Sequence, residues 1–113
     1  MTESEQPRML EGFVADLKQR GFTDYLIRRY APHADCKYHS DEWEGRYLLL
    51  EGSVTLEIAS HFQSFAEGDT YAMQANTLHR EVFGPAGGNL VVARRKVSER
   101  PLATADDAIS LSA

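Results

Sequence analysis

The chain has 113 residues, of which 42% are hydrophobic and 26% are charged. This length and composition fit one soluble globular domain and exclude a disordered or fibrous protein. The formal net charge is −5 and the cations are scattered apart from the run Arg94, Arg95 and Lys96, so nucleic acid is not an expected partner.

The N-terminal stretch MTESEQPRM has no apolar run of the signal-peptide type, and no segment of the chain has the apolar length that crosses a bilayer. We therefore expect a cytoplasmic protein that has no membrane partner. Cys36 is the only cysteine, which excludes an internal disulfide and fits a reducing compartment. The expected role of Cys36 is that of a small buried hydrophobe.

Residues 1–24 are predicted to form a polar lead followed by one short amphipathic helix. Pro7 stands near the predicted start of the helix and Gly21 at its end. Between them, apolar residues recur at helical spacing and form one stripe. The stripe consists of Met9, Leu10, Phe13, Val14 and Leu17.

Residues 25–97 change to short segments rich in β-branched and aromatic residues, separated by turn chemistry such as QANT and GPAGGN. They are interpreted as seven or eight strands, at 25–31, 35–39, 46–52, 54–59, 62–69, 70–75, 79–84 and 89–96. Such close and regular spacing favours an antiparallel barrel or sandwich over a doubly wound sheet. Residues 98–113 are expected to be a tail of the same domain, either a short helix or a frayed end.

Polar residues ahead of an apolar run form the first candidate site. Side chains alternate along a strand, so His39 and Asp41 are expected to point the same way, and Glu44 follows a bend that can turn it back toward them. Imidazole and carboxylate groups suit divalent metals of the Zn, Fe, Mn or Ni type. His79, which opens a later strand after a tight turn at 74–77, adds a distant second imidazole.

These two segments resemble the paired motifs of the cupin superfamily. In the first motif His39 matches the first histidine, Asp41 stands where the second histidine usually is, and Gly52 matches the closing glycine. In the second motif Gly68 matches the opening glycine and His79 the histidine, at the family's spacing. The resemblance covers most of the chain. It implies an all-β fold, an antiparallel double-stranded β-helix or jelly-roll cupin barrel, here with one short N-terminal α-helix.

The resemblance implies a metal site at His39, Asp41, Glu44 and His79, in which Glu44 falls at or next to the family's acidic position. Asp41 replaces a histidine, so three histidines and one carboxylate become two histidines with two carboxylates. That set is similar to the 2-His-1-carboxylate triad of non-haem iron sites. The expected cofactor is one divalent transition metal, Fe, Mn, Ni or Zn. The alternative is a barrel that has lost a ligand and binds no metal.

Two departures from the family pattern fall in turns. His33 occupies the first glycine position of the first motif, while Gln74 and Asn76 replace the proline and glycine of the second. Histidine and asparagine tolerate a left-handed backbone better than most residues do. Both turns are therefore expected to keep their shape.

Strand alternation also selects candidates for a substrate pocket. If His39 faces inward, Lys37 is expected to do so too, and Arg46 shares the face of Glu44 on the next strand. Their charges would suit an acidic or oxygen-rich ligand, or would pair with carboxylates at the barrel mouth. Trp43 is a candidate for the pocket wall, or covers the barrel rim or a partner subunit.

Two more residues are candidates near the second histidine. Tyr71 lies on the strand that leads to His79 and is a pocket candidate, although an aromatic residue there is more often part of the core. Glu81 shares the face of His79, and either Glu81 or Asp41 could act as a general base.

Two classes of function remain open on these residues. The first is a metal-dependent enzyme of dioxygenase, isomerase or lyase type on a small organic substrate, with the metal as Lewis acid or redox centre. The second is a non-catalytic module that senses a small molecule or a metal, or a metal-free structural barrel. Small cupins commonly form dimers, so the resemblance also implies a homodimer.

Overall fold

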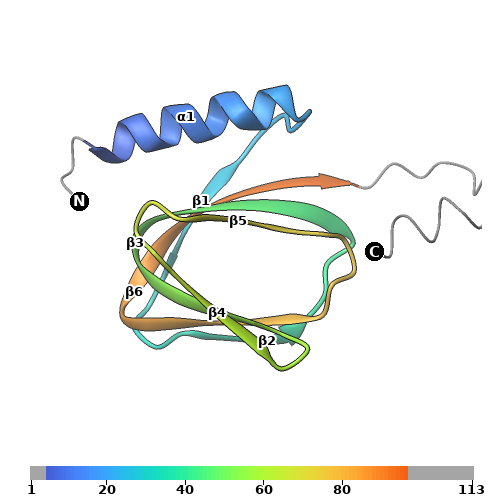
Figure 1. The fold of residues 1–113 in the computed structure, drawn as a ribbon. Coiled ribbons are helices and arrows are strands. Elements are labelled where there is room, and N and C mark those ends of the chain that lie inside the picture. The colour runs from blue at the N-terminus through green and yellow to red at the C-terminus, as the bar shows by residue number, and fades with distance from the viewer. Residues whose placement is uncertain (1–4, 97–113) are drawn as a thin grey trace, which may run out of the picture.

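The computed structural model describes residues 5–96 as one helix and six strands (Figure 1). The elements are α1 (Glu5–Gln19), β1 (Leu26–Tyr30), β2 (Asp35–His39), β3 (Trp43–Ile58), β4 (His61–Ala66), β5 (Thr70–Met73) and β6 (His79–Lys96). The predicted tail at 98–113 lies outside the described residues. No helix within residues 5–96 is long and apolar enough to cross a membrane.

All the strand pairs are antiparallel, and the strands curve round into a barrel (Figure 1). Strand β6 pairs with β1, β2 and β3, while β3 also pairs with β4 and β5. The predicted all-β barrel with one N-terminal helix is confirmed. The two long strands hold the barrel together, because every other strand pairs with one of them.

Two long strands replace four of the short strands predicted from the sequence. The segments at 46–52 and 54–59 fall largely in β3, and those at 79–84 and 89–96 fall in β6. The glycine-rich breaks bend these strands without ending them, and the β3–β6 pairing shifts register between residues 49 and 51 and between 52 and 54. The bends let one half of β3 pair with β5 and the other half with β4.

The barrel interior holds the main hydrophobic core. Leu49, Val54, Phe83 and Leu90 are each at most 1% exposed. Phe83 stacks on Tyr30 of β1, with ring centroids 4.2 Å apart. Because side chains alternate along each strand, the other side of the same strands faces outward and needs a second cover.

Helix α1 supplies that cover on the outside of the barrel (Figure 1). Phe13 and Leu17 of the predicted apolar stripe pack with Leu48 of β3 and with Val91 and Ala93 of β6 in a second core. The apolar stripe of α1 therefore has the partner that an amphipathic helix requires.

The predicted glycine caps the C-terminal end of α1, which ends at Gln19. Gly21 has a φ of 85°, its N–H donates to Lys18 O at 3.1 Å, and the N–H of Phe22 donates to Leu17 O at 2.9 Å. These two bonds satisfy carbonyl groups of the last helical turn in a Schellman motif. They also turn the chain so that Phe22 enters the second core, where it is 3% exposed.

Candidate metal centre

A backbone hydrogen bond ties together the two segments that carry the candidate ligands. His33 and Asn76 both have a left-handed backbone, with φ of 60° and 63°, so the turns keep the shape expected of them. The N–H of Asn76 donates to the carbonyl oxygen of Asp41 at 2.6 Å. This bond holds the connection between β2 and β3 against the turn that precedes His79.

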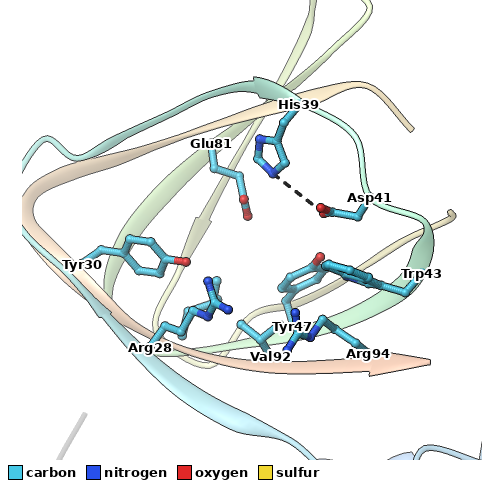
Figure 2. A pocket seen from close by; sticks show the side chains of 10 residues that line it. Arg28, Tyr30, His39, Asp41, Trp43, Tyr47, Glu81, Val92 and Arg94 are labelled. Carbon is cyan, nitrogen blue, oxygen red and sulfur yellow. Dashed lines mark ion pairs between the residues drawn. The ribbon is translucent and has the colours of Figure 1, made fainter. Parts of the chain in front are cut away.

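A pocket of about 100 Å³ lies within the barrel beside these segments (Figure 2). By this measure one water needs about 10–15 Å³, so the pocket has room for several waters or a small ligand. Its wall includes His39, Asp41, Trp43 and Glu81, which were predicted from the sequence as site residues, and Arg28 and Arg94, which were not.

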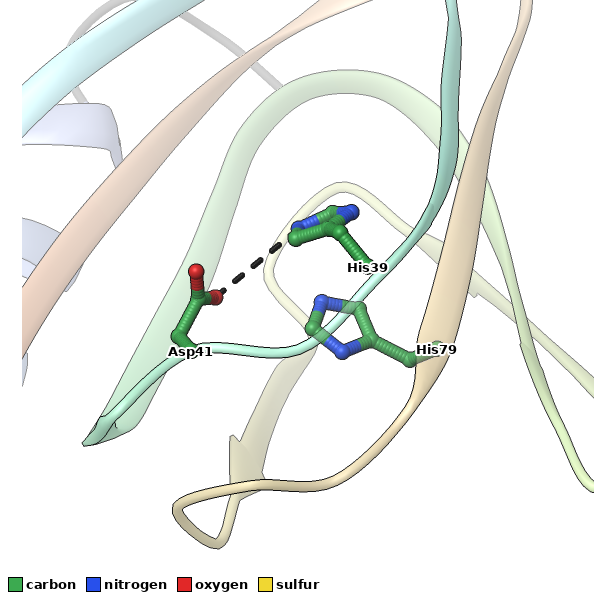
Figure 3. Close-up of side chains that lie close together, drawn as sticks. All are labelled: His39, Asp41 and His79. Carbon is green, nitrogen blue, oxygen red and sulfur yellow. Dashed lines mark ion pairs between the residues drawn. The ribbon is translucent and has the colours of Figure 1, made fainter.

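His39, Asp41 and His79 come together beside this pocket (Figure 3). One possible ligand atom from each residue lies within 4.8 Å of the others, and His39 Nε2 is 3.8 Å from Asp41 Oδ2. His39 and His79 are paired across β2 and β6, and their ring centroids are 4.3 Å apart. The sheet register therefore brings together two histidines that are distant in the sequence.

Backbone carbonyl groups orient both imidazoles. His39 Nδ1 lies 2.7 Å from Lys37 O, and His79 Nδ1 lies 2.8 Å from Thr77 O. A carbonyl oxygen only accepts hydrogen bonds, so each Nδ1 carries the hydrogen and each neutral ring keeps a free lone pair on Nε2. Metal-ligating histidines are fixed in the same way by a hydrogen bond from their other nitrogen.

The donor set fits a divalent first-row transition metal. Two imidazoles and one carboxylate suit Zn, Fe, Mn and Ni. Bonds of about 2.1 Å place the ligand atoms of one tetrahedral ion about 3.4 Å apart. Atoms that lie within 4.8 Å of one another therefore have to approach by at most about 1.4 Å to reach one ion. His79 is 1% exposed, whereas the side chain of His39 is 40% exposed, so the cluster spans the boundary between core and solvent.

Glu44, predicted as a ligand, lies outside this cluster. Its carboxylate pairs with Arg95, which faces it across the β3–β6 ladder, at 2.6 Å from Arg95 Nε. The neighbouring Gly45 takes the inner-facing position, and a Cβ atom there would overlap the hydroxyl of Tyr47, which fills the space. Because alternation sends Glu44 to the opposite face, the cluster has one carboxylate, that of Asp41.

Lys37 and Arg46 also lie outside the pocket. The β2–β6 pairing shifts register between Cys36 and His39, so the strict alternation assumed for Lys37 does not hold. Cys36 packs against the main core, and the side chain of Lys37 is 85% exposed. Arg46 shares its face of β3 with Leu48, which packs against α1.

Arg28 and Arg94 supply the positive charge of the pocket instead. Neither arginine was predicted from the sequence to line the pocket, although a signal was present. Because side chains alternate along a strand, Arg28 shares a face of β1 with the inward-facing Leu26 and Tyr30. Arg94 likewise shares a face of β6 with the inward-facing Val92. A charged residue in the buried phase of a strand indicates an interior with a polar function.

Glu81 and Tyr71 form a buried pair behind the cluster. Tyr71 Oη donates to Glu81 Oε2 at 2.5 Å, and Glu81 Oε1 lies 3.8 Å from His79 Nε2. Burial, together with the carboxylate of Glu81, raises the pKa of Tyr71 far above its usual range, so its hydroxyl stays protonated as a donor. Glu81 reaches the pocket wall, whereas Tyr71 belongs to the main core.

No family model and no curated protein matches this chain. A solved RmlC-like cupin from Shewanella frigidimarina is similar, with a TM-score of 0.58 and 17% identity over 66% of this chain and 67% of that chain. A Rhizobium leguminosarum protein of unknown function has a TM-score of 0.61 and 14% identity over 65% and 69%. A chain from the structures of the DMSP lyases RdDddP and RnDddQII has a TM-score of 0.60 and 17% identity over 66% and 39%.

The chain therefore has the fold of the cupin superfamily, as its two motifs predicted. Likeness at these identities establishes the fold and leaves the reaction open, because one fold can carry many activities. The features that bear on function are the pocket and the cluster of His39, Asp41 and His79.

Proposed function

We propose that this chain is a metal-dependent enzyme that acts on a small organic substrate, with the metal held by His39, Asp41 and His79. The observation that carries the proposal is the pair of bonds from Nδ1 to backbone carbonyl oxygens, which leaves both Nε2 atoms as free ligands near one carboxylate. The fold adds support, because structural neighbours include proteins named as lyases.

The number of ligands favours catalysis over a purely structural metal. Structural sites usually fill four coordination positions with protein side chains, whereas catalytic sites keep a position for water or substrate. Within residues 5–96 this cluster contains three such side chains, and it adjoins a pocket with polar walls. An open position beside a pocket is the arrangement expected of an enzyme and not of a closed binding module.

The residues around the pocket have separate roles in this proposal. A bound divalent ion would supply Lewis-acid or redox chemistry. Glu81 faces the pocket and would exchange a proton with the substrate, while Tyr71 fixes the Glu81 carboxylate through its hydrogen bond to Oε2. Trp43 forms an aromatic wall that would hold the apolar part of a substrate.

The proposal is tested by elemental analysis of the protein purified without a histidine tag, followed by a substrate screen. We expect about one equivalent of iron, manganese, nickel or zinc per chain. The loaded protein should convert at least one compound of a panel of small organic acids and carbonyl compounds, monitored by proton NMR with and without oxygen. Asp41→Asn, which keeps the size of the side chain, should abolish this conversion. A protein that takes up no metal after soaking would contradict the proposal.

The ligand set can be altered at one position. Asp41→His should tighten the binding of zinc or nickel by roughly tenfold or more, because imidazole is a softer donor than carboxylate. Competition with a chromophoric chelator measures the change. Asp35→His is the matched control, since the side chain of Asp35 is also 25% exposed but pairs with Arg80 outside the cluster. Equal affinities of Asp41→His and wild type would mean that residue 41 does not bind the metal.

A further inference from the structure

Two arginines reach the pocket from the side opposite the metal cluster (Figure 2). Arg28 lies on β1 and Arg94 near the end of β6. Within residues 5–96 neither guanidinium forms an ion pair. Arg20, Arg80 and Arg95, in contrast, each pair with a carboxylate on the surface. The pocket therefore contains cationic donors that no carboxylate of residues 5–96 neutralises directly.

Neighbouring aromatic residues orient both guanidinium groups. The central carbon of the Arg94 guanidinium lies 4.6 Å from the ring centroid of Trp43, and such stacking leaves the N–H donors at the edge of the group free. Burial raises the pKa of Tyr30, and a hydrogen bond with Arg28 opposes that rise. Oriented donors lose less conformational freedom when they bind an anion.

The carboxylates of the pocket are engaged on the other side. Asp41 faces His39 at 3.8 Å, and Glu81 accepts the hydrogen bond from Tyr71. With all four groups ionised, the two arginines and these two carboxylates sum to zero, so a divalent ion at the cluster would leave two positive charges unbalanced. A ligand that carries two negative charges would balance them.

We propose that the pocket binds a small organic acid, with a carboxylate held by Arg28 and Arg94 and its remaining oxygens beside the metal cluster. A guanidinium group presents its N–H donors as a planar fork that matches a carboxylate. The pocket volume of about 100 Å³ limits the ligand to a small molecule. This inference rests on the proposed function and deepens it, because it names the chemical class of the substrate.

Succinate is the probe for this proposal, and inorganic phosphate is the comparison, since it has similar charge and different geometry. Isothermal titration of the zinc-loaded protein should give saturable succinate binding at one site, tighter than that of phosphate. Arg28→Gln and Arg94→Gln should each weaken succinate binding by about tenfold or more. Their zinc content should equal that of the wild type, because neither arginine belongs to the cluster.

Arg29→Gln is the matched control. Arg29 follows Arg28 on β1 but points to the other face, where its Nε donates to Asn89 Oδ1 at 3.2 Å. This variant should bind succinate as the wild type does. Arg28→Lys should bind with intermediate affinity, because it keeps the charge and loses the planar fork.

The titration repeated on metal-free protein separates this inference from the proposed function. If the protein takes up no metal, but the wild type binds succinate and Arg28→Gln does not, the acid site is supported and the metal-dependent function is refuted. If the protein binds zinc, but the wild type, Arg28→Gln and Arg94→Gln bind succinate equally, only the acid site is refuted. Absence of succinate binding, or tighter binding of phosphate, would also overturn the assignment to an organic acid.

Discussion

Replacing His79 with alanine should abolish stoichiometric metal binding. His79 is 1% exposed, its Nδ1 is fixed by Thr77 O, and its ring lies beside that of His39. Removal of such an oriented ligand leaves two donors, and we expect metal affinity to fall by more than about 100-fold. Zinc content after dialysis, and competition with a chelator of known affinity, measure this loss. His39→Ala should have the same effect.

His61→Ala is the control, because His61 is exposed at the start of β4 and lies outside the cluster. It should keep the zinc content of the wild type. Since the side chain of His79 is buried, thermal unfolding of the metal-free variants must establish that each one is folded. A folded double variant of His39 and His79 that retained one equivalent of metal would refute the site assignment.

The general fold was predictable because the residues that determine it act locally. Gly21, Gly52 and Gly68 stand where the chain has positive φ, and so do His33 and Asn76, the two non-glycine residues expected to tolerate that conformation. The spacing between such turns, and the apolar stripe of the helix before them, can be recognised in the sequence without knowing which distant residues are in contact. The order of the two cupin-like motifs along the chain then indicated a cupin barrel.

The ligand set was only partly predictable, because it depends on register. His39, Asp41 and His79 were identified from the motifs and do lie together. The register shift between Cys36 and His39 leaves no mark in the local sequence, and it reverses the face expected for Lys37. A shift of one residue moves every later side chain of a strand to the other face.

The pocket wall was the least predictable part, since its residues meet only in the folded barrel. The glycine at position 45 leaves space that Tyr47 fills, and Tyr47 in turn stacks on Tyr71 with centroids 4.5 Å apart. The cations of the pocket, Arg28 and Arg94, come from β1 and β6, which do not pair at these two positions. Sequence spacing does not reveal that two such residues meet. Alternation along each strand identifies each of them separately as a residue that faces inward.

Replacing Gly52 with alanine should destabilise the barrel by about 3 kcal/mol or more. Gly52 has a φ of 86°, which strains any residue with a Cβ atom, and a Cβ atom there would overlap the backbone carbonyl of Gly87. Neither backbone can easily give way, because Gly52 pairs with Gly88 where β3 and β6 bend. Urea unfolding, monitored by circular dichroism, measures the change in the free energy of unfolding.

Gly12→Ala is the matched control for this experiment. Gly12 lies in α1, and a Cβ atom there would meet no heavy atom within 4 Å. The same chemical change should stabilise the protein by about 0.5–1 kcal/mol, because alanine favours a helix over glycine. A lower free energy of unfolding for Gly52→Ala together with a higher one for Gly12→Ala would show that the bend at Gly52 requires glycine. Equal urea midpoints for Gly52→Ala and the wild type would mean that the two long strands can bend without it, and that this glycine of the first motif does not determine the barrel.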